Sequence, residues 1–336
     1  MPKTKDKPIP GWAPGPMGQW METNYQGYNA ATTVEAARGW VRLLQDDGDM
    51  FVTLAGAMST AQLGITLARM IRERKVCGIG CTGANLEEDL FNLIGFNSYT
   101  YLPDYASLTP EQEMALAKKG HPRVTDATIP EAEAMKPLGD ALTAEWKKAD
   151  AAGERLFPYQ FLYRVIKSGV LADKYEGDPA NAWMLAAADV DLPIFTPGWE
   201  DSTTGNLYAS LQAKGELKTR VVRDGTEWFE EMGRWYEKAA KQTPGGIGFF
   251  QIGGGIAGDG PICVVPYLLT EMQKKVPFWA YFAQITDAHV SYGGYSGAQP
   301  REKITWSKLD VDTPMFDIHS DATIVAPLIF AYVLGD

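Results

Sequence analysis

The chain has 336 residues, of which 45% are hydrophobic and 11% aromatic, enough for a substantial core in one large domain or two closely joined domains. Its formal net charge is −11, from 42 acidic and 31 basic residues, and it has no long basic run. This balance argues against nucleic acid or an anionic membrane as a partner and permits a cationic small-molecule substrate.

The cysteine pattern and the hydrophobic runs indicate a compartment. Cys77, Cys81 and Cys263 form no paired framework and no His/Cys cluster accompanies them, so we expect reduced thiols and no metal site. The start lacks a hydrophobic signal core, and the longest apolar run, 322–335, is too short to span a bilayer. We therefore expect a soluble, cytoplasmic protein.

Helical and strand patterns alternate after a proline-rich beginning. Residues 1–30 contain five prolines within the first twenty positions and predict an irregular N-terminal arm, and residues 31–336 are expected to form a single domain. The apolar spacing in the first part of that domain predicts helices over 32–45, 61–74 and from 85 onward, and strands over 50–56 and 75–81.

The middle third, from about 109 to 190, is mostly helical in pattern. Thr109 is expected to cap a helix that starts at Pro110, and Pro137 is expected to kink or divide the next one. Beyond it the patterns predict strands over 192–196, 246–252, 276–286, 304–310 and 314–318, and helices over 225–241, over 261–275 and after 319. The alternation predicts an α/β fold: a doubly wound, mainly parallel sheet with helices on both faces and a helical middle insertion.

Ligands gather at the carboxyl ends of such strands, in the loops that lead into helices. In CTGANLEEDL (81–90), Asn85 and Glu88 fit a capping box; alternatively, the TGA backbone meets a ligand and Glu88 meets ribose hydroxyls. QIGGGIAGDG (251–260) contains a G-x-G-x-x-G, which fits either a tight turn or a backbone that approaches a phosphate.

Two further loops have the same ambiguity. Ser320 and Asp321 stand at a predicted helix start, and Asp201 follows another strand, so capping explains each of them. The loop at 81–90, the glycine-rich segment 251–260 (the glycine loop) and the loop at 319–322 would converge at one edge of the sheet. Together they therefore favour a nucleotide site.

Lys308 is the candidate nucleophile. If KITWSKLD (303–310) is extended, Ile304, Trp306 and Lys308 share one face. The amine is then either the head of a stem that lies over apolar surface, or a desolvated nucleophile.

Several segments together resemble the deoxyhypusine synthase family, most closely its bacterial deoxyhypusine-synthase-like branch. They are LAGAMSTAQLG, CTGANLEEDL, FTPGWEDSTTGN, FQIGGGIAGDG, YSGAQPREKITWSKLDVD and SDATIVAPL, in family order from about residue 50 to the C-terminus. The resemblance implies a Rossmann-like, NAD-binding catalytic domain in a homotetramer, with active sites at the interface inside each dimer. It also implies a lysine that carries an aminobutyl group as an imine.

The resemblance implies a role for individual residues. Lys308 takes the position of the imine-forming lysine, in the W-x-K context with Trp306. Glu302 matches an acid that binds the polyamine, and Asp201 matches an acid near cofactor and substrate. Eight residues fall on cofactor-contacting positions: Thr82, Gly83, Glu88, Gly254, Gly255, Ser296, Asp321 and Ala322.

The chain also departs from the family pattern. It has Asn206, Tyr292 and Tyr295 where spermidine-binding members have further acids, and Asp259 where they have a histidine. These residues are therefore candidates for an altered substrate choice.

The expected function is that of an NAD-dependent aminobutyl transferase acting on polyamines such as putrescine or spermidine, with no net redox change; a homospermidine-synthase-like reaction is one form of this function. Burial of Lys308 beside Trp306 would favour the neutral, nucleophilic amine. Modification of a protein lysine, a catalytically silent NAD-binding scaffold and an ordinary dehydrogenase stay open as alternatives.

Overall fold

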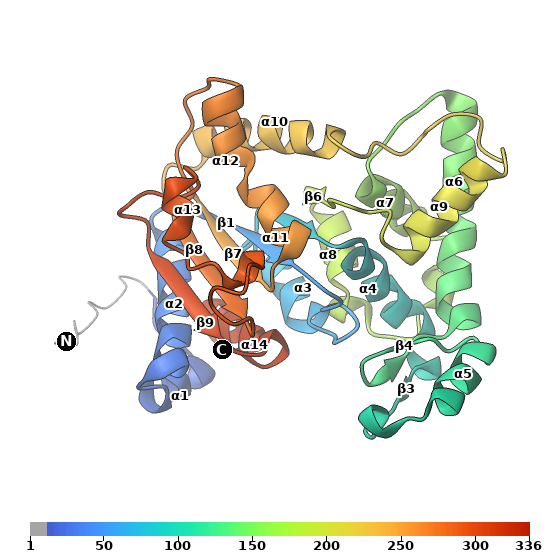
Figure 1. Cartoon of the computed structure of the whole chain (residues 1–336), viewed down its shortest axis with the longest axis horizontal. Helices are drawn as coiled ribbons and strands as arrows, with labels where there is room; N and C mark the ends of the chain where they lie inside the picture. Colours follow the sequence, from blue (N-terminus) through green and yellow to red (C-terminus); the bar gives the residue numbers. More distant parts are fainter. Residues whose placement is uncertain (1–11) are drawn as a thin grey trace.

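The computed structural model describes residues 12–336 and is built around a six-stranded, entirely parallel sheet (Figure 1). Across the sheet the strands follow the order β6 (Ile194–Phe195), β2 (Gly78–Cys81), β1 (Asp49–Leu54), β7 (Ile247–Ile252), β8 (Tyr281–Thr286) and β9 (Met315–His319). From β1 the chain adds β2 and β6 on one side, and from β7 it adds β8 and β9 on the other side. The order of the strands therefore reverses between β1 and β7. This is the doubly wound, Rossmann-like order, and it confirms the predicted fold class.

The central strands are buried on both faces, which is why their sequences are apolar without interruption. Neighbouring residues point to opposite faces. Phe51 of β1 and Phe249 of β7 join the hydrophobic cluster on one side, while Val52 and Phe250 join the cluster on the other. A strand of this kind is stable only when helices cover both faces.

Helices supply that cover. One cluster includes residues of α2 (Tyr28–Gln45), α3 (Gly64–Arg72), α4 (Gly83–Gly95), α8 (Trp183–Asp189) and α14 (Ala322–Leu334). In it Trp40 of α2 packs 4.9 Å from the ring of Phe250. The other cluster includes residues of α10 (Glu227–Gln242), α11 (Gly255–Ile262) and α12 (Val264–Pro266).

The predicted helical insertion is confirmed and carries a small sheet of its own. It holds α5 (Pro110–Lys118), α6 (Lys136–Ala152) and α7 (Pro158–Ser168), which lie with α9 (Thr203–Ala213) beside the main sheet (Figure 1). The strands β3 (Thr100–Tyr101), β5 (Ala127–Thr128) and β4 (Arg123–Val124) pair antiparallel.

Two local predictions in the insertion are confirmed. Thr109 caps α5 in a capping box with Gln112. Pro137 stands in the first turn of α6, directly after a π-helical turn over Glu131–Met135, so the long helical pattern is divided at this point.

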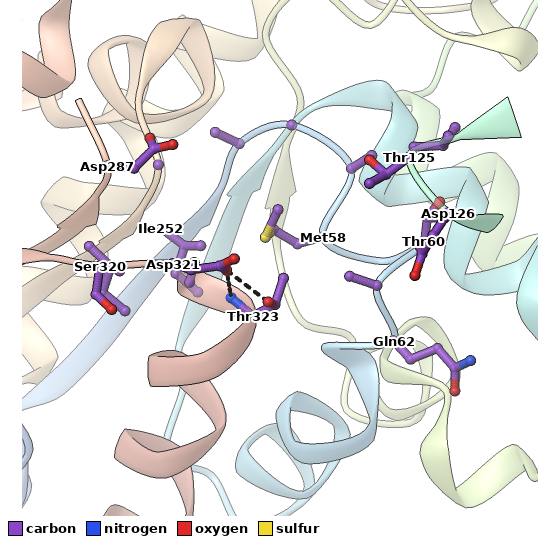
Figure 2. Close-up of a pocket in the computed structure, with 18 of the residues that line it drawn as sticks. Met58, Thr60, Gln62, Thr125, Asp126, Ile252, Asp287, Ser320, Asp321 and Thr323 are labelled. Atoms are coloured by element: carbon purple, nitrogen blue, oxygen red, sulfur yellow. Dashed lines mark hydrogen bonds between the residues drawn. The ribbon is translucent and has the colours of Figure 1, made fainter. Parts of the chain in front are cut away.

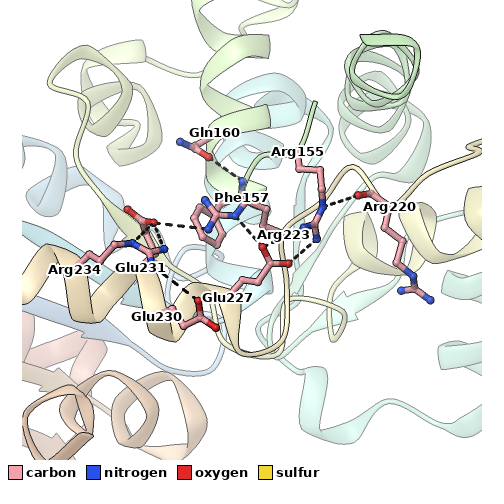
Figure 3. Close-up of polar contacts among 9 residues, drawn as sticks. All are labelled: Arg155, Phe157, Gln160, Arg220, Arg223, Glu227, Glu230, Glu231 and Arg234. Atoms are coloured by element: carbon pink, nitrogen blue, oxygen red, sulfur yellow. Dashed lines mark hydrogen bonds and ion pairs between the residues drawn. The ribbon is translucent and has the colours of Figure 1, made fainter. Parts of the chain in front are cut away.

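A charged network joins the insertion to α10 (Figure 3). Arg155, just before α7, donates to both carboxylate oxygens of Glu227, at 2.6 and 3.3 Å, and Arg223 donates to the same carboxylate at 3.1 Å. Leu156 and Val222 form a parallel bridge beside it. The insertion is therefore held by backbone pairing as well as by ion pairs.

Three predicted elements are wrong. The irregular arm was expected to extend to residue 30; residues 1–11 lie outside the described part, but Pro16–Asn24 form helix α1 and α2 already begins at Tyr28. The helix predicted over 261–275 is divided into the end of α11, α12 and a π-turn over Tyr267–Glu271. Its two prolines lack the amide proton that a continuous helix requires.

The segment 304–310 is not a strand. Glu302–Thr305 form the short helix α13, Trp306 follows in a turn, and only Leu309 makes an isolated bridge, to Trp279. The amide of Lys308 donates to the Lys303 carbonyl at 3.0 Å, which closes the turn. Trp306 and Lys308 therefore do not share a strand face.

Between residues 12 and 336 no helix combines the length and the apolar character needed to cross a membrane.

Candidate functional site

The main cavity lies at the carboxyl ends of the central strands, where the order of the sheet reverses. It has a volume of about 860 Å³. Most of its lining comes from the last residues of β7 and β8 and from the segments that follow β1, β7, β8 and β9: Ala55–Met58, Thr60–Gln62, Ile252, Gly253, Ile285–Asp287 and Ser320–Thr323. In doubly wound sheets this crevice is where nucleotides bind.

The small antiparallel sheet supplies the opposite wall. Tyr101, Val124, Thr125 and Asp126 complete the lining, and Figure 2 shows Thr125 and Asp126 across the cavity from Asp321. Among residues 12–336, three carboxylates and no Lys or Arg side chain belong to the lining. The cavity therefore offers acceptors for hydroxyl or ammonium groups, and any phosphate there has to rely on backbone amides.

The glycine loop borders this cavity. Gly253 lines it with a backbone φ of +72°, and Gly255, at the first position of α11, has a φ of +62° and open space at its Cβ position. Both angles are in the region that favours glycine. At Gly254 a glycine is needed for a different reason, which is close packing. A Cβ at this position would lie 2.6 Å from the Cβ of Ser296, one of the residues predicted to contact the cofactor.

Thr82 and Gly83 shape the start of α4. Thr82, not Asn85, is the N-cap: its hydroxyl accepts from the Asn85 amide at 3.2 Å and donates to the carbonyl of Gly56 at 2.7 Å. The predicted capping box of Asn85 and Glu88 is therefore wrong. Gly83 allows close packing, since a Cβ there would lie 2.6 Å from the Cβ of Ser202.

Glu88 is connected to the cavity through the side chain of one other residue. It accepts a hydrogen bond from the hydroxyl of Thr60, which lines the cavity. Burial raises the pKa of Glu88 to about 7, and the charge of Glu87 adds a smaller increase. Glu88 therefore stands behind the lining rather than in it.

Asp321 and Ala322 line the cavity directly. Asp321 also caps α14, as the helix-start pattern predicts: its carboxylate accepts from the amide and from the hydroxyl of Thr323, both at 2.7 Å (Figure 2). A cap of this kind fixes one carboxylate oxygen.

Asp201 and Asn206 lie outside the lining. Both are exposed, and Ser202 rather than Asp201 caps α9. The Asn206 side chain donates to the backbone carbonyls of Glu200 and Ser202 at 2.9 and 2.8 Å.

The second part of the site is the lysine cluster, which consists of Lys308, Asp259 and Tyr295 and lies next to the glycine loop. The side chain of Lys308 is 9% exposed, and its Nζ lies 2.9 Å from the Oδ1 of Asp259 on α11. The same Nζ stands 5.4 Å from the centroid of the Tyr295 ring. The structure thus brings together Lys308, Asp259 and Tyr295, which the sequence singles out for different reasons. Asp259 contacts the amine of Lys308 directly.

The indole expected beside Lys308 is elsewhere. Trp306 is 69% exposed, Tyr292 is 61% exposed, and Glu302 is exposed as the first residue of α13. The predicted burial of Lys308 by Trp306 is therefore wrong, and the ring beside the amine belongs to Tyr295.

A polar row joins the two parts of the site. The Tyr295 hydroxyl donates to the Oε1 of Gln251 at 2.9 Å, and the Nε2 of Gln251 donates to the carbonyl of Gly253 in the cavity wall at 2.8 Å. On the neighbouring strands the Gln284 amide donates to Asp317 at 2.8 Å. This row is missed by the sequence reasoning, although amide side chains inside otherwise apolar strands (FFQI, FAQIT) are a visible signal.

The buried position of Lys303 is likewise not predicted by the sequence. This residue is only 2% exposed, and its Nζ has no hydrogen-bond partner among residues 12–336. The alternating charges of PREKITWSK give no sign that this lysine, rather than its neighbours, is buried.

The site is suited to a dinucleotide. The cavity volume is in the range of cofactor pockets, the carboxylates of the lining could accept hydrogen bonds from ribose hydroxyls, and the glycine loop leads into α11 at the cavity's border. Asp321 and Ala322 would hold part of such a group directly, while Glu88 would act through Thr60.

The comparisons with known proteins agree with this architecture. The family model for deoxyhypusine synthase matches residues 19–333. A deoxyhypusine synthase-like protein from Nostoc sp. is 26% identical over 94% of this chain and 80% of its own length. A probable deoxyhypusine synthase from Archaeoglobus fulgidus is 26% identical over 91% of this chain and 90% of its own. The solved structure of an Entamoeba histolytica protein assigned as a deoxyhypusine synthase shares the fold, with a TM-score of 0.55 at 12% identity over 91% of this chain and 88% of that one.

Proposed function

Because the chain belongs to the deoxyhypusine synthase family, we propose that it is an NAD-dependent aminobutyl transferase that acts on polyamines through an imine on Lys308. One observation carries the proposal. The Lys308 amine is shielded from bulk water beside Asp259, and the polar row Tyr295–Gln251–Gly253 joins it to the cavity where the strand order reverses.

NAD, when bound, would accept a hydride from the carbon next to a substrate amine and return it at the end, which leaves no net redox change. The oxidised substrate carries a C=N bond. Lys308 adds to that carbon, the original amine leaves with a proton, and the aminobutyl group stays on Nζ as an imine. An acceptor amine then adds to the same carbon and frees Lys308, so no water is consumed.

Asp259 has a defined part in this sequence. Its Oδ1 is within hydrogen-bond distance of the Nζ of Lys308. The ammonium of Lys308 must lose a proton before its nitrogen can attack. Asp259 therefore directs the amine and is the nearest carboxylate to receive that proton, while its 46% exposure leaves it open to a cationic substrate as well. The Tyr295 ring, 5.4 Å from the same Nζ, shields the amine from water.

The charge of the surroundings supports an amine substrate. In the described part of the chain, Asp126, Asp287 and Asp321 line the cavity without a basic side chain, and Glu302 and Asp201 are exposed acids. Because neutral Asn206, Tyr292 and Tyr295 occupy positions expected to be acidic, we propose a donor and acceptor with few charges, such as putrescine, and a homospermidine-like product. The site would be completed by a second copy of the chain in a homotetramer.

The test is product analysis with NAD and isotope-labelled putrescine or spermidine, followed by mass spectrometry. We expect a labelled aminobutyl product from the unmutated protein and a loss of at least about a thousandfold in Lys308→Ala, because nucleophile and imine are removed together. Lys147→Ala is the matched control, since Lys147 is an exposed lysine paired with Glu216.

Borohydride trapping distinguishes the alternatives. A reduced aminobutyl adduct on the peptide that contains Lys308 supports the proposal. Label on the lysine of an added acceptor protein, without a small-molecule product, would assign deoxyhypusine formation instead. NAD binding without an adduct would contradict transferase chemistry and indicate a scaffold.

A further inference from the structure

Lys303 is buried in a way that lysines rarely are. Its exposure is 2%, and the burial includes Nζ, so the ammonium does not reach out to water along the aliphatic stem. Within the described residues Nζ has no hydrogen-bond partner. An unpaired buried charge is costly and calls for an explanation.

Two aromatic rings take the place of hydrogen-bond acceptors. The Nζ of Lys303 stands 4.7 Å from the centroid of Phe282 and 4.9 Å from that of Tyr295. Such contacts stabilise a cation but offer no site for a proton. The second of these rings is the one next to the Nζ of Lys308, so both amines lie over Tyr295.

The backbone keeps the two lysines in a fixed relation. Lys303 lies inside α13, and its carbonyl accepts from the amide of Lys308 at 3.0 Å across the turn that follows. This turn therefore fixes the backbones of the two lysines relative to each other, and the shared Tyr295 ring places both amines on the same side chain.

The charged groups around Lys303 come from four elements. They are Lys308 after α13, Asp317 on β9, Asp259 on α11 and Glu302 at the start of α13, with the Tyr295 phenol as a further titratable group. The pKa of Lys303 is lowered to about 8, chiefly by burial and to a smaller extent by the charge of Lys308, while the three carboxylates act against this lowering.

We infer that Lys303 is a positioning residue: its buried ammonium repels the proton that Asp259 stabilises on Lys308 and so increases the share of Lys308 that is a free amine. The inference rests on the proposed function, because it concerns the nucleophile of that reaction. Desolvated lysines next to a second cation are one of the ways in which proteins obtain a nucleophilic amine.

The experiment measures the Lys308 amine without NAD or polyamine. The folded protein is treated briefly with formaldehyde and cyanoborohydride at pH 7.5, and methylation of each lysine is measured by peptide mapping. Lys303→Met, which keeps an unbranched side chain of similar length without the charge, should lower the labelling rate of Lys308 by about tenfold. Asp259→Asn should raise it, and Lys147 should be labelled equally in all variants.

A Lys308 rate in Lys303→Met within twofold of the unmutated protein would overturn the inference. A second measurement needs no substitution. As the pH rises through the titration of Lys303, the repulsion disappears, so labelling of Lys308 in the unmutated protein should increase over a wider pH range than one ionisation gives. A profile that a single ionisation describes would also overturn the inference.

The two proposals fail separately. If Lys308 labelling responds to Lys303→Met but no aminobutyl product forms, the proposed function fails and the coupling of the lysines stands. If product forms and labelling does not respond, only the role of Lys303 is lost.

Discussion

Glu88 shows how burial of a single residue next to the cavity makes the stability of the protein depend on pH. Its carboxyl pKa is raised from 4.5 to about 7, chiefly by burial. The folded state therefore binds this proton more tightly than the unfolded state, and the resulting stability is present below pH 4.5 and is lost as the pH rises through 7. The whole effect amounts to roughly 3 kcal/mol.

We expect Glu88→Gln to remove this pH dependence in part. Between pH 5 and 8 the free energy of unfolding should fall less steeply in the variant than in the unmutated protein. Buried Asp89, whose pKa burial also raises to about 7, keeps a slope of its own. Urea unfolding at several pH values measures this, and Glu271→Gln, at an exposed glutamate, is the control. Parallel pH profiles for Glu88→Gln and the unmutated protein would contradict it.

Residue-scale predictability differs between the two lysines. Lys308 is found from the sequence because a family motif surrounds it. Lys303 is not, because its burial depends on Phe282 and Tyr295, which reach it from other elements of the fold. Local pattern carries no information on such tertiary neighbours.

At the scale of elements, the glycine loop packs closely against the segment Tyr295–Gly297, whose Tyr295 ring stands beside the amine of Lys308. A Cβ at Gly254 would lie 2.6 Å from the Cβ and 2.8 Å from the Oγ of Ser296. Since both segments are anchored at buried strands, we expect Gly254→Ala to cost about 1–3 kcal/mol and to lower the melting temperature.

A second substitution tests the cause. Ser296→Gly removes the atoms that the new methyl group meets, so the double variant should regain most of the lost melting temperature in calorimetry. Gly27→Ala, where φ is −156° and no atom lies within 4 Å of the added Cβ, should change little. If Ser296→Gly does not restore stability, the contact between these two segments is not what makes Gly254 necessary.

Strands were predictable from the sequence where they are buried on both faces, as in β1 and β7, because continuous apolar runs bounded by turns have few other solutions. The segment 304–310 was not. A few residues of alternating character fit a strand as well as a single helical turn, and the hydrogen bond from Lys308 to Lys303 decides for the turn.

At the scale of the whole molecule, apolar side chains remain exposed around the site. Ile256 on α11 is 59% exposed and follows the glycine loop, Ile324 on α14 is 63% exposed and follows the cavity residues Asp321 and Ala322, and Trp306 is 69% exposed. Exposed apolar groups gathered around one functional region are typical of surfaces that another subunit covers. A second copy of this chain is the cover that the proposed homotetramer provides.

This predicts that assembly and activity are lost together. The unmutated chain, of 36.9 kDa, should behave in light scattering as a tetramer. Ile324→Asp introduces a charge that cannot be buried at such an interface, so it should give smaller species and reduce activity by at least about tenfold. Val170→Asp, at a residue that is 56% exposed after α7 in the helical insertion, should leave both unchanged. A fully active monomer would show that one chain completes the site and that the exposed side chains serve another purpose.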